Sequence, residues 1–403
     1  MFALPDYSAF AKKAEIVCLY LAIITGVAAP ISTAVTSFAY AGFFLAWLVS
    51  GQILKTLHVS LSQPAGKAIL VFFIWLAIGM LYAPTSWHDK VITLLSWKKI
   101  FFTLILLGLF IEKKWKHRFI FVYMIVMTLS VSISWGLWLL GLPVLDKELG
   151  IIMTNHTSQS MAFVAASLCC LYLWSENSFV NKQWLLIAFL LFASNILFIS
   201  ASRSGYLALP VAIIFVIICL NNRKHLLSVL LVVLTVFTVA YFTSTMFKSS
   251  IEKGVEESAS YKTSENFTSI GARMIFLENT LELIKQRPLI GYGTSSFKNV
   301  YGAYAEKKYN DWRGEPVSDP HNQYLFVWFE NGLIGLLLFL GYIFTVLKQS
   351  LSGNKFAFIA AGFMLAVCST SFFNSHFKTF PEGFLLAFFI GILLARDEQI
   401  VRI

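Results

Sequence analysis

The sequence is built from long apolar runs separated by short polar segments. A helix needs about 20 consecutive apolar residues to cross the hydrocarbon core of a bilayer, and runs near that length recur along most of the chain. The apolar residues do not alternate with polar ones, as they would in half-buried strands. The pattern therefore predicts an all-α, polytopic membrane protein with about twelve transmembrane helices. The predicted spans cover residues 14–30, 32–50, 66–83, 98–112, 118–141, 159–175, 183–200, 204–221, 225–243, 320–347, 355–373 and 382–396.

One polar segment is too long to be a simple connection. Residues 244–319 lie between the ninth and tenth predicted spans, as an insertion into a single integral membrane domain that covers residues 1–403. Within this segment, apolar residues recur at spacings of three and four, which predicts an amphipathic helix. These positions are Ile270, Met274, Leu277, Leu281 and Ile284. Ser269 is the expected N-cap of this helix, and Arg287-Pro288 is expected to end it.

Charged residues are sparse, and their positions predict the orientation of the chain. Only 13% of the residues are charged, against about a quarter in soluble domains. The net charge of +10 could indicate nucleic-acid binding, but no basic tract with interleaved aromatics is present. Instead, fifteen Lys and Arg residues lie in one set of short loops and six in the other. Because basic loops stay in the cytoplasm, both termini are expected there, and residues 244–319 are expected on the outer side of the membrane.

Neither a disulfide nor a metal site is expected. The five cysteines all lie within apolar runs, and no Cys-x-x-Cys or Cys/His spacing typical of a zinc site is present. The sequence also shows no Asp-rich metal signature and no paired carboxylates in a motif. We therefore predict a protein without a metal or another cofactor.

Two arginine motifs are expected on the outer side. Arg203 lies in the Ser-Arg-Ser-Gly motif at 202–205, in a very short turn between two spans, where an arginine is costly unless it is hydrated or paired. It could bind an anion, or it could only extend to the lipid headgroups. Arg273 lies in the Gly-Ala-Arg motif at 271–273, in the first turn of the predicted amphipathic helix. Free N–H groups there attract anions, and a guanidinium suits phosphate oxygens; the alternative is a solvated arginine on the helix face.

A histidine motif, Asp319-Pro320-His321-Asn322, opens the tenth predicted span. Asp is a favoured N-cap and Pro is favoured at the first helical position, so His321 is expected in the first turn of that span. The helix dipole disfavours an imidazolium there, so the ring is expected to be neutral at pH 7 and able to accept a proton. The alternative is a histidine that is bonded to the backbone of the capping region.

Other polar residues carry weaker signals. The glycine-rich stretch at 291–297 permits close approach of the backbone, but it does not lie between a strand and a helix, so a structural turn is the favoured interpretation. Lys99 lies at a helix entrance, where it could contact a ligand or only extend to the headgroups. His88, His156 and His376 are lone histidines on the outer side, and their roles stay open.

The three motifs, taken in order, resemble a known family. The stretch SASRSG lies between two spans, TSIGARMIFLENTLELIKQRPLIGYGTSSF lies in the long segment, and DPHNQYLFVWFENGLIG opens the next span. This order and spacing resemble those of the superfamily of bacterial O-antigen ligases, O-antigen polymerases and O-oligosaccharyltransferases. The motifs cover about residues 200–340, and the twelve-span layout extends the resemblance over the whole chain.

The resemblance implies a glycosyltransferase of the bacterial inner membrane that acts on the periplasmic face without a metal. Its donor would be a glycan on undecaprenyl pyrophosphate, and in the ligases the acceptor is a sugar hydroxyl of the lipid A core. The family residues map onto Arg203 and Arg273, which would bind the pyrophosphate, and onto His321, which would act as the general base. Direct attack by the acceptor would invert the anomeric configuration. Further candidate substrate-binding residues are Asn322, Tyr292 and Lys99.

Three alternatives to an O-antigen ligase stay open. Polymerases typically carry a second sizeable outer loop, whereas the largest others here are about residues 84–97 and 142–158. Protein O-oligosaccharyltransferases generally carry a larger soluble C-terminal region, and this chain is expected to end shortly after its last span. A non-enzymatic transporter is expected to place ionisable residues in mid-span, where Glu330 comes closest. A ligase that acts on lipid-linked substrates, and not on nucleic acid, is the favoured prediction.

Overall fold

The computed structural model describes residues 7–144, 146–176, 180–200, 202–219, 226–261, 267–351 and 354–397. All of the regular structure in these residues is helical, so the predicted all-α fold is confirmed. The helices are α1 (Tyr7–Ala28), α2 (Thr33–Val49), α3 (Ile53–Ser62), α4 (Pro64–Tyr82), α5 (Trp87–Ser96), α6 (Lys98–Leu109), α7 (Lys113–Leu140), α8 (His156–Ser175), α9 (Lys182–Phe198), α10 (Arg203–Cys219), α11 (Leu226–Thr243), α12 (Thr245–Ser260), α13 (Ser269–Gln286), α14 (Phe297–Lys308), η2 (Trp312–Gly314, a 3-10 turn), α15 (Gln323–Ser350), α16 (Lys355–Thr370) and α17 (Phe380–Leu394). The junction between the predicted spans 204–221 and 225–243 lies outside the described residues. So do three of the fifteen Lys and Arg residues assigned to the cytoplasmic loops, Arg223, Lys224 and Arg402.

A helix lies at each of the twelve predicted spans, and α3 and α5 are additional helices that the sequence pattern did not predict. Among the described residues, the helices long and apolar enough to cross a membrane alone are α4, α7, α8 and α15. The number rises to six if two bent pairs each form one span: α2 with α3, bent by 104°, and α5 with α6, bent by 43°. The count of twelve spans therefore stays a prediction.

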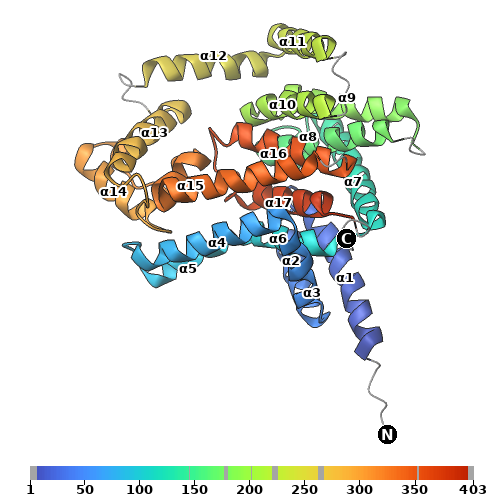
Figure 1. Cartoon of the computed structure of the whole chain (residues 1–403). Helices are drawn as coiled ribbons and strands as arrows, with labels where there is room; N and C mark the ends of the chain where they lie inside the picture. The colour runs from blue at the N-terminus through green and yellow to red at the C-terminus, as the bar shows by residue number, and fades with distance from the viewer. Residues whose placement is uncertain are drawn as a thin grey trace.

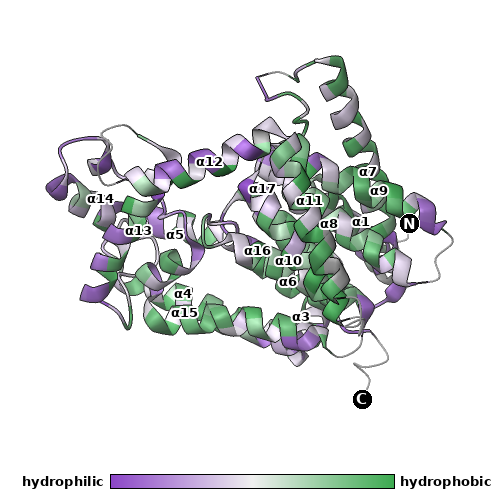
Figure 2. Ribbon diagram, turned by 90° about the horizontal axis from the view of Figure 1, so that it is seen from above, coloured by the Kyte–Doolittle hydropathy of each residue, from purple (hydrophilic) through white to green (hydrophobic). Residues whose placement is uncertain are grey.

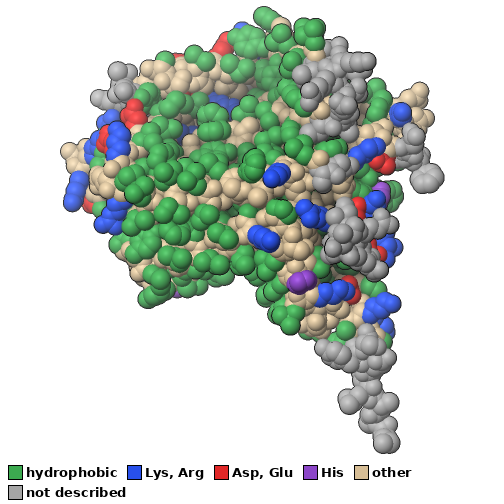
Figure 3. Space-filling model, in the orientation of Figure 1, with side chains coloured by type: hydrophobic (Ala, Val, Ile, Leu, Met, Phe, Trp, Pro, Cys, Tyr) green, Lys and Arg blue, Asp and Glu red, His purple; other side chains and the backbone are tan. Residues whose placement is uncertain are grey.

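Several of the shorter apolar helices are covered by other helices. The side chains of α17 from Pro381 to Leu394 are buried, and this helix packs against α1, α6 and α16 (Figure 1). The outer helices instead expose large apolar side chains: Phe38 of α2 is 82% exposed and Leu81 of α4 is 72% exposed. Figure 3 shows apolar side chains spread over a broad face of the molecule. Because water disfavours such a surface, these helices and their exposed faces indicate a membrane protein.

The segment between α11 and α15 folds into helices instead of forming an open loop. It contains α12, α13 and α14, and α13 packs against α12, α14 and α15. Figure 2 shows more hydrophilic residues on α13 and α14 than on the bundle helices. The predicted amphipathic helix is present as α13, but the expected N-cap at Ser269 is wrong. Thr268 is the N-cap, and its Oγ1 accepts a hydrogen bond from the Gly271 amide at 3.1 Å.

The buried face of α13 is also rotated relative to the predicted stripe. The predicted positions at 270, 274, 277 and 281 are only half-buried, whereas the fully buried face includes Phe276, Asn279 and Leu283. A polar residue is tolerated inside because both polar atoms of the Asn279 amide are hydrogen-bonded: its Nδ2 donates to Tyr301 Oη and its Oδ1 accepts from Lys308 Nζ, each at 3.1 Å. A pattern read from apolar residues alone therefore misplaces this face.

α15 is broken at Gly332, where a φ of +66° and a ψ of −175° leave the helical region. The glycine-rich turn that precedes α14 fills the break and replaces the missing helical hydrogen bonds. The carbonyl of Pro288 accepts the amide of Leu333 at 2.8 Å, and the amide of Gly293 donates to the carbonyl of Glu330 at 2.7 Å. The turn that was interpreted as structural thus ties the segment containing α13 and α14 to the membrane helix α15.

Candidate active site

Arg203 is the first residue of α10, and its exposed guanidinium extends to α12. Its Nε donates to the carbonyl of Ser250 at 3.2 Å, and the side chain passes Gly254, where an added Cβ would lie 3.8 Å from the arginine Cζ. On the other side of the motif, Gly205 lets α10 approach Ser160 of α8, since a Cβ there would lie 2.7 Å from the serine Cβ. The motif therefore joins α8, α10 and α12 and directs the arginine toward α12.

Arg273 lies at the start of the second turn of α13, one residue later than predicted because the helix begins at Ser269, and it is half-buried. Burial lowers its pKa, and the positive charge of Arg203 lowers it further, whereas Asp319 and Glu257 raise it. The charge of Arg203 thus exerts a repulsion on Arg273 in a partly desolvated environment. An anion between them would relieve this repulsion, and a phosphate or pyrophosphate has the oxygens to match both. Figure 3 shows a hollow beneath α12 with basic side chains inside it.

His321 lies in the turn before α15, so its predicted place in the first helical turn is wrong. α15 begins at Gln323, and Asn322 is its N-cap: its Oδ1 accepts the amides of Tyr324 and Leu325, each at 3.0 Å. Asp and Asn are comparably good N-caps, so two competing caps stand three residues apart, and the later one starts the helix. His321 itself adopts a left-handed conformation with a φ of +53°.

The environment of the His321 ring still favours the neutral form. Burial lowers its pKa below the ordinary value for histidine, Asp319 opposes this effect, and Arg273 reinforces it. The ring of Phe276, one turn after Arg273, lies nearly parallel to the imidazole, with 6.2 Å between the centroids and 21° between the planes. A neutral imidazole is therefore expected at pH 7, but its cause is burial and not the helix dipole.

The loop between α16 and α17, at residues 371–379, connects the motifs and was not identified as part of the site from the sequence. Asn374 Nδ2 donates to Ser204 Oγ at 3.1 Å, and Ser375 Oγ donates to Asp319 Oδ1 at 3.0 Å. The loop thus bonds to the neighbours of both the first arginine and the histidine. Its one visible signal is a run of three polar residues, Asn-Ser-His, between two apolar segments.

The three lone histidines occupy different environments. His376 is 1% exposed, and neither of its ring nitrogens has a hydrogen-bond partner among the described residues. Burial lowers its pKa, Glu382 opposes this effect, and Arg273 reinforces it. By contrast, His88 and His156 are exposed, in α5 and at the start of α8. Of the three, His376 is therefore the one that shares the surroundings of the arginine pair.

Lys99 and Tyr292 make contacts within the protein. The ammonium of Lys99, in α6, donates to the carbonyls of Lys378 and Thr379, the second at 2.8 Å. The hydroxyl of Tyr292 donates to the carbonyl of Leu283 at 3.0 Å. Both residues, like the N-cap Asn322, thus support the framework around the motifs, and their contact with a substrate stays a proposal.

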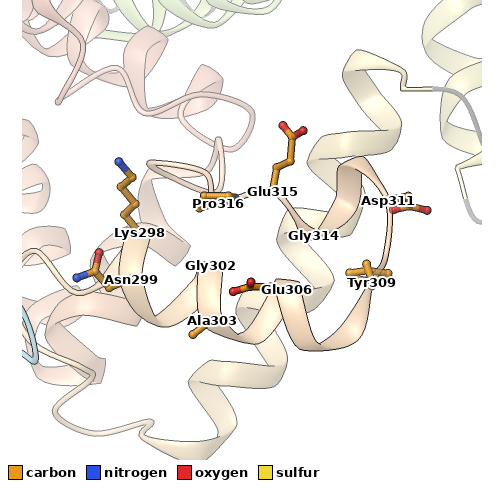
Figure 4. Close-up of a pocket in the computed structure, with 10 residues that line it drawn as sticks. All are labelled: Lys298, Asn299, Gly302, Ala303, Glu306, Tyr309, Asp311, Gly314, Glu315 and Pro316. Carbon is orange, nitrogen blue, oxygen red and sulfur yellow. The ribbon is translucent and has the colours of Figure 1, made fainter.

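A separate groove of about 700 Å³ opens beside α14 and η2 (Figure 4). Its lining residues are Lys298, Asn299, Gly302, Ala303, Glu306, Tyr309, Asp311, Gly314, Glu315 and Pro316. This lining contains none of the candidate site residues. In the described part of the chain, no three His, Cys, Asp or Glu side chains are grouped so that they could hold a metal ion.

Comparisons with known proteins address the resemblance directly. Residues 186–340, which include all three motifs, match the model of the O-antigen ligase family. An uncharacterized protein of Haemophilus influenzae is 29% identical over 154 residues, which are 36% of this chain and 38% of that protein. An O-antigen ligase of Salmonella typhimurium is 23% identical over 251 residues, which are 60% of this chain and 54% of that protein.

The matched part of the chain thus spans 38% and 54% of the lengths of these two curated relatives. The family match covers the arginine and histidine motifs together with the segment between them. The resemblance inferred from the three motifs is confirmed as a similarity: residues 186–340 match the model of the O-antigen ligase family, and the chain is similar to a curated O-antigen ligase.

Proposed function

We propose that this protein is an O-antigen ligase that transfers a glycan from undecaprenyl pyrophosphate to a sugar hydroxyl of the lipid A core. The observation that carries the proposal is that residues 186–340, which contain Arg203, Arg273 and His321 in the three motifs, match the model of the O-antigen ligase family. The influence of Arg203 on Arg273, and of Arg273 on His321, supports a site in which two guanidiniums bind an anion beside a neutral imidazole. We further propose that the reaction occurs on the periplasmic face of the bacterial inner membrane, with both termini in the cytoplasm.

The proposed roles follow from the charges that change during transfer. Negative charge develops on the pyrophosphate as its bond to the sugar breaks, and the two guanidiniums can neutralise it. The acceptor hydroxyl must lose a proton as it attacks the anomeric carbon, and His321 can accept that proton. Attack opposite the leaving group inverts the anomeric configuration. The lipid anchors of both substrates hold them near the same membrane surface, which supplies proximity.

An O-antigen polymerase would use the same groups with a second lipid-linked glycan as its acceptor. The similarity over 251 residues to a curated O-antigen ligase favours the ligase. The deciding experiment offers the purified protein a lipid-linked glycan donor with either lipid A core or a second lipid-linked glycan. A ligase should transfer to lipid A core; transfer to the lipid-linked glycan alone would assign the polymerase instead.

Arg203→Ala and Arg273→Ala are each expected to weaken donor binding and to lower turnover by about 10- to 100-fold. This range corresponds to one hydrogen bond to a charged group, roughly 1.5–3 kcal/mol. Lysine at either position should restore only part of the activity, because an ammonium lacks the bidentate fork. Donor binding and transfer rate are measured separately. Arg118→Ala is the control, since that guanidinium stacks on Trp115 in α7, 4.5 Å from the ring centroid. Unchanged donor binding in both site variants would place the anion site elsewhere.

Glycan transfer is expected to survive metal chelation. The motive is the absence of an Asp-rich metal signature from the sequence, together with two arginines that can supply the positive charge a divalent ion would otherwise bring. Transfer is measured in excess EDTA and again after Mg²⁺ or Mn²⁺ is added. A loss in EDTA that either ion reverses would contradict the arginine-based mechanism.

A further inference from the structure

Asp319 is connected both to His321 and to the loop between α16 and α17. Its Oδ1 accepts a hydrogen bond from the His321 amide at 2.8 Å and another from the Ser375 hydroxyl at 3.0 Å. The same oxygen lies 3.9 Å from Nδ1 of the His321 ring. One carboxylate oxygen therefore holds the main chain of the candidate base and approaches its imidazole.

The backbone of His321 needs such support. A φ of +53° places it in the left-handed region, which is unfavourable for a non-glycine residue. Residues persist in this conformation when their surroundings determine it, and they gather at functional sites. The bond from the His321 amide to the side chain of Asp319, two residues earlier, is an Asx-turn contact that holds this turn. On the other side of the turn, Asn322 Nδ2 donates to the carbonyl of Phe372 at 3.1 Å, which fixes the chain to the same loop.

We propose that Asp319 is the positioning residue of His321 and that Ser375 holds its carboxylate in place. The proposal rests on the function proposed above, in which His321 accepts the proton of the acceptor hydroxyl. A carboxylate beside Nδ1 favours the tautomer with the proton on Nδ1 and leaves Nε2 free to accept. The separation of 3.9 Å is longer than a hydrogen bond, but such contacts often tighten only when substrate binds.

The transfer step shows what this carboxylate contributes. The acceptor oxygen bonds to the anomeric carbon, the bond from that carbon to the phosphate oxygen breaks, and its electron pair leaves with undecaprenyl pyrophosphate. The hydroxyl proton moves to His321 Nε2. The resulting imidazolium faces Arg273 of α13, which repels it, and Asp319 offsets this repulsion. Lys378, in the loop between α16 and α17, interacts in turn with Asp319. The charges that act on the base directly are therefore those of Asp319 and Arg273.

The test removes the charge of Asp319 while keeping the turn. Asparagine can accept the His321 amide as aspartate does, so Asp319→Asn isolates the electrostatic part. Asp319→Glu keeps the charge. The control is Asp311→Asn, because Asp311 makes the same kind of turn, with its Oδ1 accepting the Arg313 amide at 2.9 Å, at an exposed position beside η2.

Asp319→Asn is expected to lower the transfer rate at saturating donor by about 10- to 100-fold and to leave donor binding unchanged. The rate is lost at low pH as the ring of His321 becomes protonated. Asp319 raises the pKa of that ring, so Asp319→Asn should move this acid limb of the pH–rate profile to lower pH. Asp319→Glu should keep the acid limb of the pH–rate profile at its normal position and retain part of the rate. Asp311→Asn should match the unmodified protein in both rate and pH profile. A merely structural role would lower the rate without moving the limb.

The proposal is overturned if Asp319→Asn retains the normal rate and pH profile while His321→Ala is inactive. If His321→Ala itself remains active, the general-base assignment of the proposed function fails instead.

In the His321→Ala background, Asp319→Asn should cause little further loss, because the two residues would act as one unit. Ser375→Ala leaves the turn untouched and is expected to lower the rate several-fold; if Asp319→Asn does not fold, an unchanged rate in Ser375→Ala overturns the proposal.

Discussion

His321→Ala is expected to lower the rate of glycan transfer by about 10²–10⁴-fold, the range typical of the loss of a positioned general base. The ring is half-buried beside Arg273, and burial keeps its pKa below the ordinary value, so the imidazole is neutral at pH 7. Without it, the acceptor hydroxyl must attack with its proton still attached or lose that proton to water. The donor would be held by the arginines, so its binding should remain.

The measurement is transfer in vitro from an undecaprenyl-pyrophosphate glycan to lipid A core, with donor binding assayed separately. His88→Ala is the matched control, because His88 is a lone histidine of α5 whose side chain is 82% exposed. Turnover of His321→Ala near the normal rate would show that the base is assigned wrongly. The buried His376 would then be the next candidate, or the donor would depart before the acceptor attacks and no side-chain base would be needed.

The positions of the twelve helices at the predicted spans were predictable because long apolar runs leave the backbone few alternatives. In an apolar environment each amide and carbonyl must be bonded within the protein, which a helix achieves locally. The number of membrane spans was not predictable in the same way. The residues of α17 are as apolar as those of a membrane-spanning helix, yet they are buried among α1, α6 and α16. Hydropathy does not distinguish a helix covered by protein from one covered by lipid.

The site was predictable in its residue types but not in its detailed geometry. Arg203, Arg273 and His321 were selected because of their shared placement near helix ends on one side of the membrane and their match to the three motifs. In the structure Arg203 influences Arg273, and Arg273 influences His321, but their roles stay a prediction. The turn around His321 was mispredicted because both Asp319 and Asn322 can cap a helix. Asn322 also donates to a carbonyl in the loop between α16 and α17, and no local pattern contains that contact.

The contribution of that loop could not be inferred from the sequence. Asn374 bonds to a serine 170 positions earlier, and Ser375 bonds to an aspartate 56 positions earlier. Such contacts depend on how α10, α15 and α16 pack against one another, and periodicity within one helix carries no information about them. The break in α15 could not be inferred from periodicity either. The sequence showed Glu330 as a charged residue within an apolar span, but it did not show that Glu330 contacts the glycine-rich turn.

Gly332→Ala is expected to lower the stability of the protein by more than about 3 kcal/mol. The φ and ψ of Gly332, +66° and −175°, lie in a region essentially restricted to glycine, and occupying it costs another residue about 1–3 kcal/mol. An added Cβ would also overlap the carbonyl group of Leu289. Those atoms belong to the backbone of the inserted turn, where the Leu289 carbonyl accepts the Ile334 amide at 3.3 Å. The clash can therefore be relieved only by pushing the turn out of the break in α15.

Gly341→Ala is the matched control for this prediction. It lies in the same helix, and an added Cβ there meets nothing within 4 Å, so alanine should be neutral or stabilise the protein by up to about 1 kcal/mol through its higher helix propensity. Thermal unfolding in detergent compares the two variants, and Gly332→Ala should melt well below the unmodified protein while Gly341→Ala should not. Because the turn connects α15 to α13, surviving Gly332→Ala protein should also bind donor less tightly through a displaced Arg273. Equal melting of both variants would show that the break in α15 is not a fixed feature of the fold.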